Sequence, residues 1–353
     1  MHKDLSYNAE VLKRQLVKMK KTMLAAVFEG QEKLSIKEVL VPEIEKEDDV
    51  IIKVIATGIC GTDLHILYDN STPFVRPDSI LGHEMVGEAV KTGKMVKNVS
   101  PGDRVVIDPN EYCGYCDCCR MNLFSLCTNK KQIFGTFSEF TKASSKIVFK
   151  ISDNVEPETA CLVEPLANVI NGAVKLKIQP WESVFIFGGG PIGLMFSKFL
   201  DIQGALKILI SETSKYRRRF AEGFGADIIL DPLNDSYPDI MESIKKTGVA
   251  AVIDTVGLFC NEGIKMVRKG GRILLFSTYN MNCEIPQFDI TFKEISLLGS
   301  LGPGSYFLQA IKLLEAKPEE FSALVTHVYK LENILEGFDV LKTQQAMKVI
   351  IKP

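Results

Sequence analysis

The sequence predicts an α/β protein of two domains, one a partly open β-barrel and the other a doubly wound parallel sheet. Three observations support this fold class. The chain has 353 residues, more than one compact core usually accommodates. Its first 160 residues contain short alternating apolar runs interrupted by Gly and Pro, which is typical of antiparallel strands. From about residue 184, buried apolar strands alternate with helical segments, the pattern of a parallel sheet.

The composition is that of an ordinary globular protein and argues against several classes of function. Apolar residues make up 46% of the chain, and 42 basic residues stand against 44 acidic ones for a net charge of −2. This balance gives no electrostatic basis for binding nucleic acid or an anionic membrane. No apolar run in the sequence approaches the roughly eighteen residues of a membrane helix. We therefore expect a soluble, cytoplasmic protein whose partner is a small molecule, with no nucleic acid and no membrane.

Residues 1–21 differ from the rest of the chain because basic side chains outnumber acidic ones and apolar residues recur at helical spacing. We interpret them as an N-terminal extension, either an additional surface helix or a flexible arm, with an organelle-targeting signal as the alternative. A series of strands follows, which we expect at residues 23–28, 34–41 and 50–56. Strand and turn signals continue to residue 107, so this part of the chain is predicted to be mostly β.

The stretch 58–65, Gly-Ile-Cys-Gly-Thr-Asp-Leu-His, places a thiol, a hydroxyl, a carboxylate and an imidazole within a few residues. Its two glycines bracket Cys60 and allow the backbone to turn sharply. A helical turn that includes Asp63 would put Thr62 and His65 on one face. The alternatives are a buried thiol in a glycine turn for Cys60 and an ordinary surface histidine for His65.

His83 and Glu84 follow as adjacent residues, and with Cys60 they offer a thiolate, an imidazole and a carboxylate. These ligand types hold a zinc ion with one coordination position open. A second candidate carboxylate is Glu164, which lies in the otherwise apolar segment 160–168 and is costly to bury unless it is paired or bound to metal. The alternative for Glu164 is a partly exposed residue at the start of a helix. The third ligand is therefore Glu84, Glu164 or each in turn.

A second metal site is predicted by four cysteines in the spacing C-x2-C-x2-C-x7-C: Cys113, Cys116, Cys119 and Cys127. Four thiolates at this spacing can surround a zinc ion tetrahedrally without help from the rest of the fold. Such a closed site leaves no position for substrate, so we expect a structural zinc that pins a loop. An iron–sulfur cluster is the chief alternative. So many cysteines close together in a chain of this size indicate metal binding in a reducing compartment, and not a disulfide framework.

The segment 188–193, Gly-Gly-Gly-Pro-Ile-Gly, follows a buried strand at residues 184–187 and opens a helix. In this context the G-x-G-x-x-G motif indicates a dinucleotide-binding βαβ unit, whose glycines let the backbone approach the pyrophosphate. Glu212 ends the next strand, about 20 residues later, where such units bind the adenosine ribose. Further strands expected at 226–230, 250–254, 271–276 and 295–299 complete a six-stranded sheet. The predicted cofactor-binding residues are Gly188, Gly190, Pro191, Ile192, Gly193, Glu212 and Arg217.

Two opposing signals bear on the choice between NAD and NADP. The carboxylate of Glu212 would bind the ribose hydroxyls and repel the 2′-phosphate of NADP. Lys215 and the three arginines at 217–219 follow on the next helix and could pair with that phosphate. We expect the carboxylate to prevail and the cofactor to be NAD.

These motifs resemble those of one family, the zinc-dependent medium-chain alcohol and polyol dehydrogenases. The resemblance covers nearly the whole chain from about residue 23. It includes GICGTDLH, GHEMVGEAV at 82–90, GDRV at 102–105, the cysteine lobe, LVEPLANV at 162–169 and GGGPIG. The Val-Glu-Pro-Leu element and Glu84 are most similar to the sorbitol and threonine dehydrogenase branches. Residues 300–302, Ser-Leu-Gly, differ from the Arg-Tyr pair of mammalian-type sorbitol dehydrogenases, so the substrate stays open.

The resemblance implies a GroES-like catalytic domain at residues 1–168, including the extension 1–21 and a structural zinc lobe at 113–127. A Rossmann domain would follow at 169–302, and residues 303–353 would return to the catalytic domain. The family also implies a homodimer or homotetramer.

The activity that the resemblance implies is oxidation of a secondary alcohol, such as a polyol or sugar alcohol, to a ketone by NAD, with two zinc ions per chain. The catalytic zinc would lower the pKa of the substrate hydroxyl. Thr62 and His65 would carry the released proton to solvent, and Asp63 would accept the distal N–H of His83. L-Threonine 3-dehydrogenase and a simple secondary-alcohol dehydrogenase are the alternatives within the family. A zinc-ribbon nucleic-acid-binding protein is the alternative outside it, and the few basic and aromatic residues around the cysteines argue against it.

Overall fold

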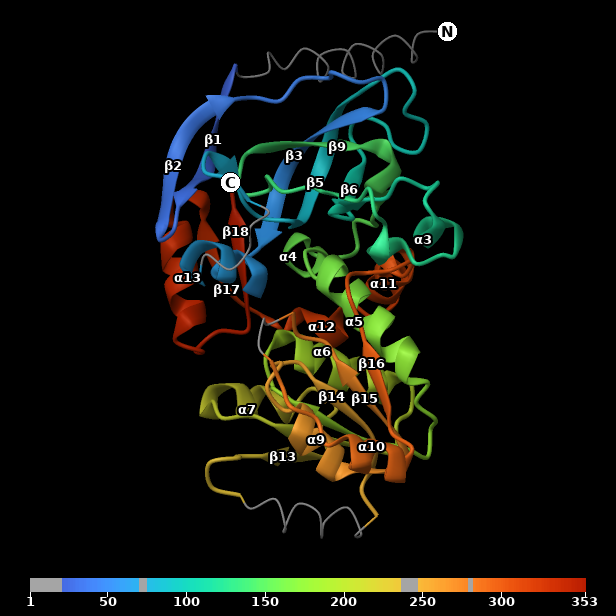
Figure 1. Cartoon of the computed structure of the whole chain (residues 1–353). Coiled ribbons are helices and arrows are strands. Elements are labelled where there is room, and N and C mark those ends of the chain that lie inside the picture. The colour runs from blue at the N-terminus through green and yellow to red at the C-terminus, as the bar shows by residue number, and fades with distance from the viewer. Residues whose placement is uncertain (1–20, 70–74, 236–246, 279–281) are drawn as a thin grey trace, which may run out of the picture.

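The computed structural model describes residues 21–69, 75–235, 247–278 and 282–353. It shows two lobes, a β-rich lobe formed by the N-terminal part of the chain together with its last strands, and a second lobe formed by the middle of the chain (Figure 1). Helix α5 (Val163–Leu176) lies where the lobes meet. The extension expected at residues 1–21 falls outside the described residues except for its last position. Within the described ranges, no helix is long and apolar enough to cross a membrane.

The β-rich lobe contains two main sheets. The smaller has the order β2 (Lys33–Leu40), β1 (Thr22–Gly30) and β4 (Ser79–Ile80). The larger runs β10 (Val148–Lys150), β6 (Arg104–Ile107), β5 (Glu84–Thr92), β3 (Asp49–Gly58), β18 (Lys348–Lys352) and β17 (Val325–Lys330), with β9 (Phe140–Ser144) also paired to β3. The expected β unit and its first three strands are confirmed.

The second lobe is built on a parallel six-stranded sheet in the order β13 (Ile228–Leu230), β12 (Lys207–Ser211), β11 (Ser183–Phe187), β14 (Val249–Asp254), β15 (Val267–Leu275) and β16 (Ser296–Gly299). This is the doubly wound order of a Rossmann sheet. Its central strands are continuously apolar because helices cover both faces. The covering helices include α6 (Pro191–Ile202), α7 (Lys215–Ala221), α9 (Cys260–Met266) and α10 (Gln287–Lys293). The predicted six-stranded sheet is confirmed.

The last segment of the chain leaves this sheet and returns to the β-rich lobe. Helix α11 (Phe307–Ala316) packs on α5, and β18 inserts between β3 and β17 in the larger sheet. Between them lie α12 (Glu319–Ser322), the 3-10 turn Leu331–Asn333 and α13 (Ile334–Lys342). The insertion of β18 brings residue Lys348 next to the strand that ends at Gly58.

One hydrophobic core joins the two lobes and so holds the segment with His83 and Glu84 at a fixed position relative to the glycine loop after β11. It includes Val86 of β5, Leu166 of α5, Ile186 of β11 and Leu194 of α6, all fully buried. The remaining elements are short. They are α2 (Gly61–Leu64), the π-helical turn His65–Asp69, β7 (Asn110–Glu111), α3 (Asp117–Arg120), the 3-10 turns Phe124–Leu126 and Ser145–Ile147, β8 (Lys131–Gln132) and α4 (Pro157–Ala160).

Candidate active site

A cleft of about 450 Å³ between the lobes is lined by residues from both groups predicted from the sequence, the metal ligands and the dinucleotide loop. The β-rich lobe contributes Cys60, Glu84 and Lys348 to its lining. The second lobe contributes the glycine loop after β11 and Glu212. Two of the candidate metal ligands, Cys60 and Glu84, therefore face the same space as the candidate dinucleotide loop.

Cys60, His83 and Glu84 converge because β3 and β5 are antiparallel neighbours. Gly58, the last residue of β3, is in register with Glu84, the first residue of β5. Cys60 follows Gly58 closely as the N-cap residue of α2. One potential ligand atom from each of the three side chains lies within 4.8 Å of the others. A single strand pair thus brings together ligands that are far apart in the sequence.

Asp63 is fully buried and ties the two ligand-bearing segments together. Its carboxylate accepts hydrogen bonds from the backbone N–H of Cys60 at 2.9 Å and of Gly82 at 3.4 Å. The Nδ1 atom of His83 is 3.7 Å from Asp63 Oδ1, beyond hydrogen-bond length. Burial alone would lower the pKa of His83, but the carboxylate of Asp63 and the thiolate of Cys60 outweigh it and raise that pKa well above the usual value.

Nδ1 of His83 is buried and has no hydrogen-bond partner among the described residues, whereas Oε2 of Glu84 is met only by the ammonium of Lys348. Buried polar atoms are normally satisfied, so the unpaired imidazole nitrogen indicates a missing partner. The cluster supplies one sulfur, one imidazole and one carboxylate, which is a donor set of open zinc sites. The three residues fit a zinc ion that keeps one position free.

Glu164 lies outside the three-residue cluster. It is on α5, and its Oε1 accepts a hydrogen bond from Asn168 Nδ2 at 2.8 Å. Burial raises the pKa of Glu164 to about 7, with His83 opposing this rise and Glu84 adding to it. The structure therefore brings Glu84 into ligand distance and leaves Glu164 next to the site, so a role for Glu164 on the metal stays a prediction.

Thr62 and His65 are both exposed. Thr62 Oγ1 is 3.7 Å from the sulfur of Cys60, and the ring Nδ1 of His65 lies 2.5 Å from the carboxylate of Asp69. The two residues sit in successive short helical turns, α2 and the π-helical turn that follows it. Thr62 thus lies beside the Cys60 sulfur at the protein surface, and the role of Thr62 and His65 in proton transfer stays a prediction.

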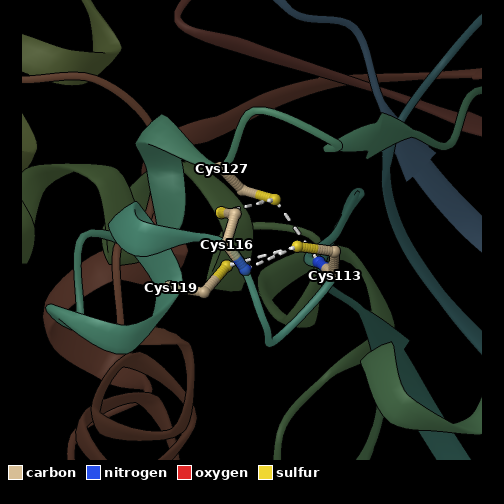
Figure 2. Close-up of side chains that lie close together, drawn as sticks. All are labelled: Cys113, Cys116, Cys119 and Cys127. Atoms are coloured by element: carbon tan, nitrogen blue, oxygen red, sulfur yellow. Dashed lines mark hydrogen bonds between the residues drawn. The ribbon is translucent and has the colours of Figure 1, made fainter.

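The four cysteines of the lobe direct their sulfurs toward one another (Figure 2). The sulfurs of Cys113 and Cys119 are 3.9 Å apart, as are those of Cys116 and Cys127. Zn–S bonds of about 2.3 Å in a tetrahedron give sulfur–sulfur edges of about 3.8 Å. All four sulfurs lie within 4.8 Å of one another, which accommodates a single ion and leaves no room for an iron–sulfur cluster. The lobe fits a structural zinc.

The glycine loop after β11 has no room for side chains at two points. Gly188 has φ +94°, and a Cβ there would lie 2.6 Å from Thr255 Oγ1. A Cβ on Gly193 would lie only 1.9 Å from the carbonyl oxygen of Gly188. Gly190 is the N-cap and Pro191 the first residue of α6, so the loop exposes a helix N-terminus to the cleft. Such a terminus is suited to bind a pyrophosphate.

Glu212 follows β12 directly and is buried against the glycine loop. Its Oε2 accepts a hydrogen bond from Gly189 N–H at 2.8 Å, and its Oε1 accepts one from Ser214 N–H at 2.7 Å. The carboxylate is held at the end of the strand that the sequence predicted, in the wall of the cleft.

The basic residues after Glu212 separate into different environments. Arg218 donates to the carbonyls of Glu212 and Thr213 and pairs with Asp231, so it holds the loop in place. Arg217 lines the cleft: a Cβ on Gly190 would lie 3.5 Å from Arg217 Nη1. Its Nε finds no acceptor in the described part of the chain, and burial lowers its pKa. Arg217 is therefore the basic residue placed to meet a phosphate in the cleft.

Lys348 is a site residue that the sequence motifs do not include, although the sequence contains a signal for it. It interrupts an apolar run at 346–351, as Glu164 interrupts the apolar segment 160–168. The side chain is 5% exposed and forms an ion pair with Glu84. Its location depends on β18 lying beside β3, which no local pattern predicts.

Comparisons with known proteins agree with this geometry. The family described as "Alcohol dehydrogenase GroES-like domain" matches residues 46–153, and the family described as "Zinc-binding dehydrogenase" matches residues 191–316. An L-threonine 3-dehydrogenase of Pyrococcus abyssi is 32% identical over 86% of this chain and 90% of its own. A sorbitol dehydrogenase of Bacillus subtilis is 31% identical over 94% of this chain and 97% of its own. The structure of a zinc-binding dehydrogenase from Sinorhizobium meliloti bound to NADP superposes with a TM-score of 0.86 at 29% identity, covering 95% of this chain and all of that one.

Proposed function

Because the chain belongs to the zinc-dependent medium-chain alcohol and polyol dehydrogenases, we propose that it oxidises a secondary alcohol group of a polyol or sugar alcohol to a ketone with NAD. The observation that carries this proposal is the common cleft, in which Cys60 and Glu84 face the glycine loop and Glu212. A metal-ligand cluster and a dinucleotide site that share one space are what hydride transfer from an alcohol requires.

In this proposal Cys60, His83 and Glu84 hold one zinc ion, and the cysteine lobe holds a second. When bound, zinc supplies Lewis acidity and NAD accepts the hydride. Asp63 orients the ligands through its bonds to the Cys60 and Gly82 backbone.

The chain's own residues would move the proton that the alcohol loses. The hydroxyl of Thr62 lies beside Cys60 and can accept a proton from the substrate while it passes its own onward. His65 is exposed and lies against Asp69, so it can take up that proton and release it to solvent. Glu164, with its pKa near 7, is a second group next to the cluster that can gain or lose a proton near neutral pH.

For the cofactor we infer a preference for NAD over NADP. The support is the position of Glu212, whose carboxylate is fixed by two backbone N–H groups in the wall of the cleft. A 2′-phosphate near it would meet a fixed negative charge. Arg217 in the same wall acts in the opposite direction, and the relative solved with NADP is an example of this fold with the phosphorylated cofactor.

For the assembly we infer a homodimer or homotetramer in a reducing, cytoplasmic compartment. Among the described residues, strand β16 forms an edge of the parallel sheet. On α10, which packs on the neighbouring strand β15, Phe288 and Phe292 stack on each other while 75% and 63% exposed. An unpaired strand edge and exposed aromatic side chains both favour association with a second copy. None of the nine cysteines is in a disulfide, which suits a reducing compartment.

L-Threonine 3-dehydrogenase and a simple secondary-alcohol dehydrogenase remain the second candidates. The relative named L-threonine 3-dehydrogenase is as similar to this chain as the sorbitol dehydrogenase is. The test is formation of NADH with a panel of polyols, L-threonine and short secondary alcohols, with the Cys60→Ser variant as the blank. A polyol as the best substrate supports the proposal, and L-threonine as the best substrate selects the alternative. Absence of NADH or NADPH formation with every substrate would contradict a dehydrogenase of these alcohols.

A further inference from the structure

A buried lysine from the far end of the chain lies against the candidate zinc ligands. Lys348 is 5% exposed, and its ammonium forms an ion pair with the carboxylate of Glu84, which is 1% exposed. The ion pair places the ammonium of Lys348 on a carboxylate that the zinc ion also needs.

The fold makes space for this pair at Gly58. Strand β3 lies between β5 and β18, so Glu84 and Lys348 come from strands that are not neighbours. A Cβ on Gly58 would lie 2.4 Å from Glu84 Oε2 and 3.0 Å from Lys348 Cε. The two side chains meet over the one position of the intervening strand that has no side chain. This contact is built into the sheet.

A zinc ion and an ammonium group on one carboxylate repel each other and compete for it. In the metal-free protein the ammonium neutralises a carboxylate that would otherwise be buried without a partner. With metal present, the same ammonium draws Glu84 away from the ion. The structure thus gives Glu84 two alternative partners, one from the protein and one from solution.

We propose that Lys348 is a positioning residue that shares Glu84 with the zinc ion and so limits how tightly the cleft holds zinc. This inference rests on the zinc site of the proposed function, and it adds Lys348 as the residue that determines how strongly the third ligand, Glu84, binds the zinc ion. By this account the carboxylate can leave the ion without becoming unpaired, because Lys348 receives it.

The test measures zinc retention by the holoenzyme in a titration with a chromophoric chelator. In this titration the cleft zinc is identified as the zinc that the unmodified protein contains and the Cys60→Ser variant lacks. We expect Lys348→Met to hold this zinc about tenfold or more tightly, the scale on which groups around a metal site act. Lys348→Arg keeps the charge and should stay within threefold of the unmodified protein. A second readout is thermal stability: zinc should raise the melting temperature of Lys348→Met more than that of the unmodified protein, since its metal-free form has an unpaired carboxylate.

Lys198 provides a matched control because it is also a buried lysine in ion pairs, with Asp201 and Glu320, in the other lobe. Lys198→Met should lower stability and leave zinc retention unchanged. If Lys348→Met does not fold, Lys348→Gln removes the charge while it keeps a donor for Glu84, and the same tightening is expected.

A double-mutant cycle separates positioning from simple charge repulsion. In a Glu84→Gln background, the removal of Lys348 should change zinc retention by less than threefold, because the shared carboxylate is gone. Equal or weaker zinc retention in folded Lys348→Met or Lys348→Gln overturns the inference, and so does a full tightening in the Glu84→Gln background. If the unmodified protein holds no zinc that Cys60→Ser lacks, the zinc site of the proposed function itself has failed.

Discussion

The substitution Gly58→Ala tests whether the carboxylate of Glu84 is a zinc ligand in the position that the structure gives it. The added Cβ would lie 2.4 Å from Glu84 Oε2, whereas a carbon and an oxygen in contact are about 3.3 Å apart, so the carboxylate has to move by about 1 Å. Oε2 is the end of a flexible side chain and Gly58 is a strand residue, so the fold should persist. Metal–ligand distances tolerate deviations of only about 0.2 Å, so the displaced oxygen no longer reaches the ion.

We expect Gly58→Ala to lower the zinc affinity of the cleft by about 10- to 100-fold, with a parallel loss of kcat/KM, while the far-UV circular dichroism is retained. The assay is chelator competition combined with steady-state kinetics. Gly61→Ala is the matched control, because Gly61 is on the other side of Cys60 and a Cβ there has no atom within 4 Å. Zinc affinity of Gly58→Ala within threefold of the control would refute the assignment of Glu84 as a ligand.

Three further predictions follow from the geometry of the cleft and its surroundings. Glu84→Gln and Glu164→Gln should both lose most activity, but only Glu84→Gln should lose zinc. Zinc loss in Glu164→Gln alone, measured by elemental analysis, would show that Glu164 and not Glu84 is the third zinc ligand. The unmodified enzyme should prefer NAD over NADP by roughly a hundredfold, and Glu212→Ser should narrow or reverse this preference, because it removes the fixed negative charge and leaves Arg217. Equal use of NADP and NAD by the unmodified enzyme in steady-state kinetics would show that Arg217 determines the cofactor preference. Burial raises the pKa of Asp108 to about 6. The contribution of protonated Asp108 to the free energy of unfolding is therefore fully present below about pH 4 and is lost as the pH rises through 6. Asp108→Asn should remove this pH-dependent loss of stability, because its amide can keep the hydrogen bonds to Asn110 and Tyr112. The variant should be more stable than the unmodified protein by up to about 3 kcal/mol at pH 8. The measurement is urea unfolding as a function of pH, and parallel profiles for the two proteins would contradict the prediction.

The parts of the site that depend on local chemistry could be predicted from the sequence. The glycine loop, Glu212 and the cysteine lobe are each encoded within a short segment, because strand, turn and helix follow one another there. The convergence of Cys60 with His83 and Glu84 was predictable from ligand chemistry. Its cause, the register of Gly58 against Glu84, is visible only once β3 and β5 are paired.

The parts that depend on distant segments could not be predicted. Lys348 reaches Glu84 because β18 inserts beside β3, an event that involves residues about 290 positions apart in the chain. Arg217 lines the cleft whereas Arg218 pairs with Asp231, and this difference depends on which face of a short helix turns to the cleft. The positive charge that the two residues share does not indicate which of them faces the cleft. Non-local strand order and side-chain direction are properties of the packed structure.

The most direct test of the central claim is the zinc content of active, purified protein, measured together with that of two cysteine variants. Two zinc ions per chain are expected. Cys60→Ser should keep one zinc and its fold but lose activity, since the cleft site sits on a formed domain. Cys116→Ser should lose the lobe zinc and unfold at a lower temperature, because a structural site contributes directly to folding. Iron in place of zinc, or full activity of a metal-free preparation, would contradict the account.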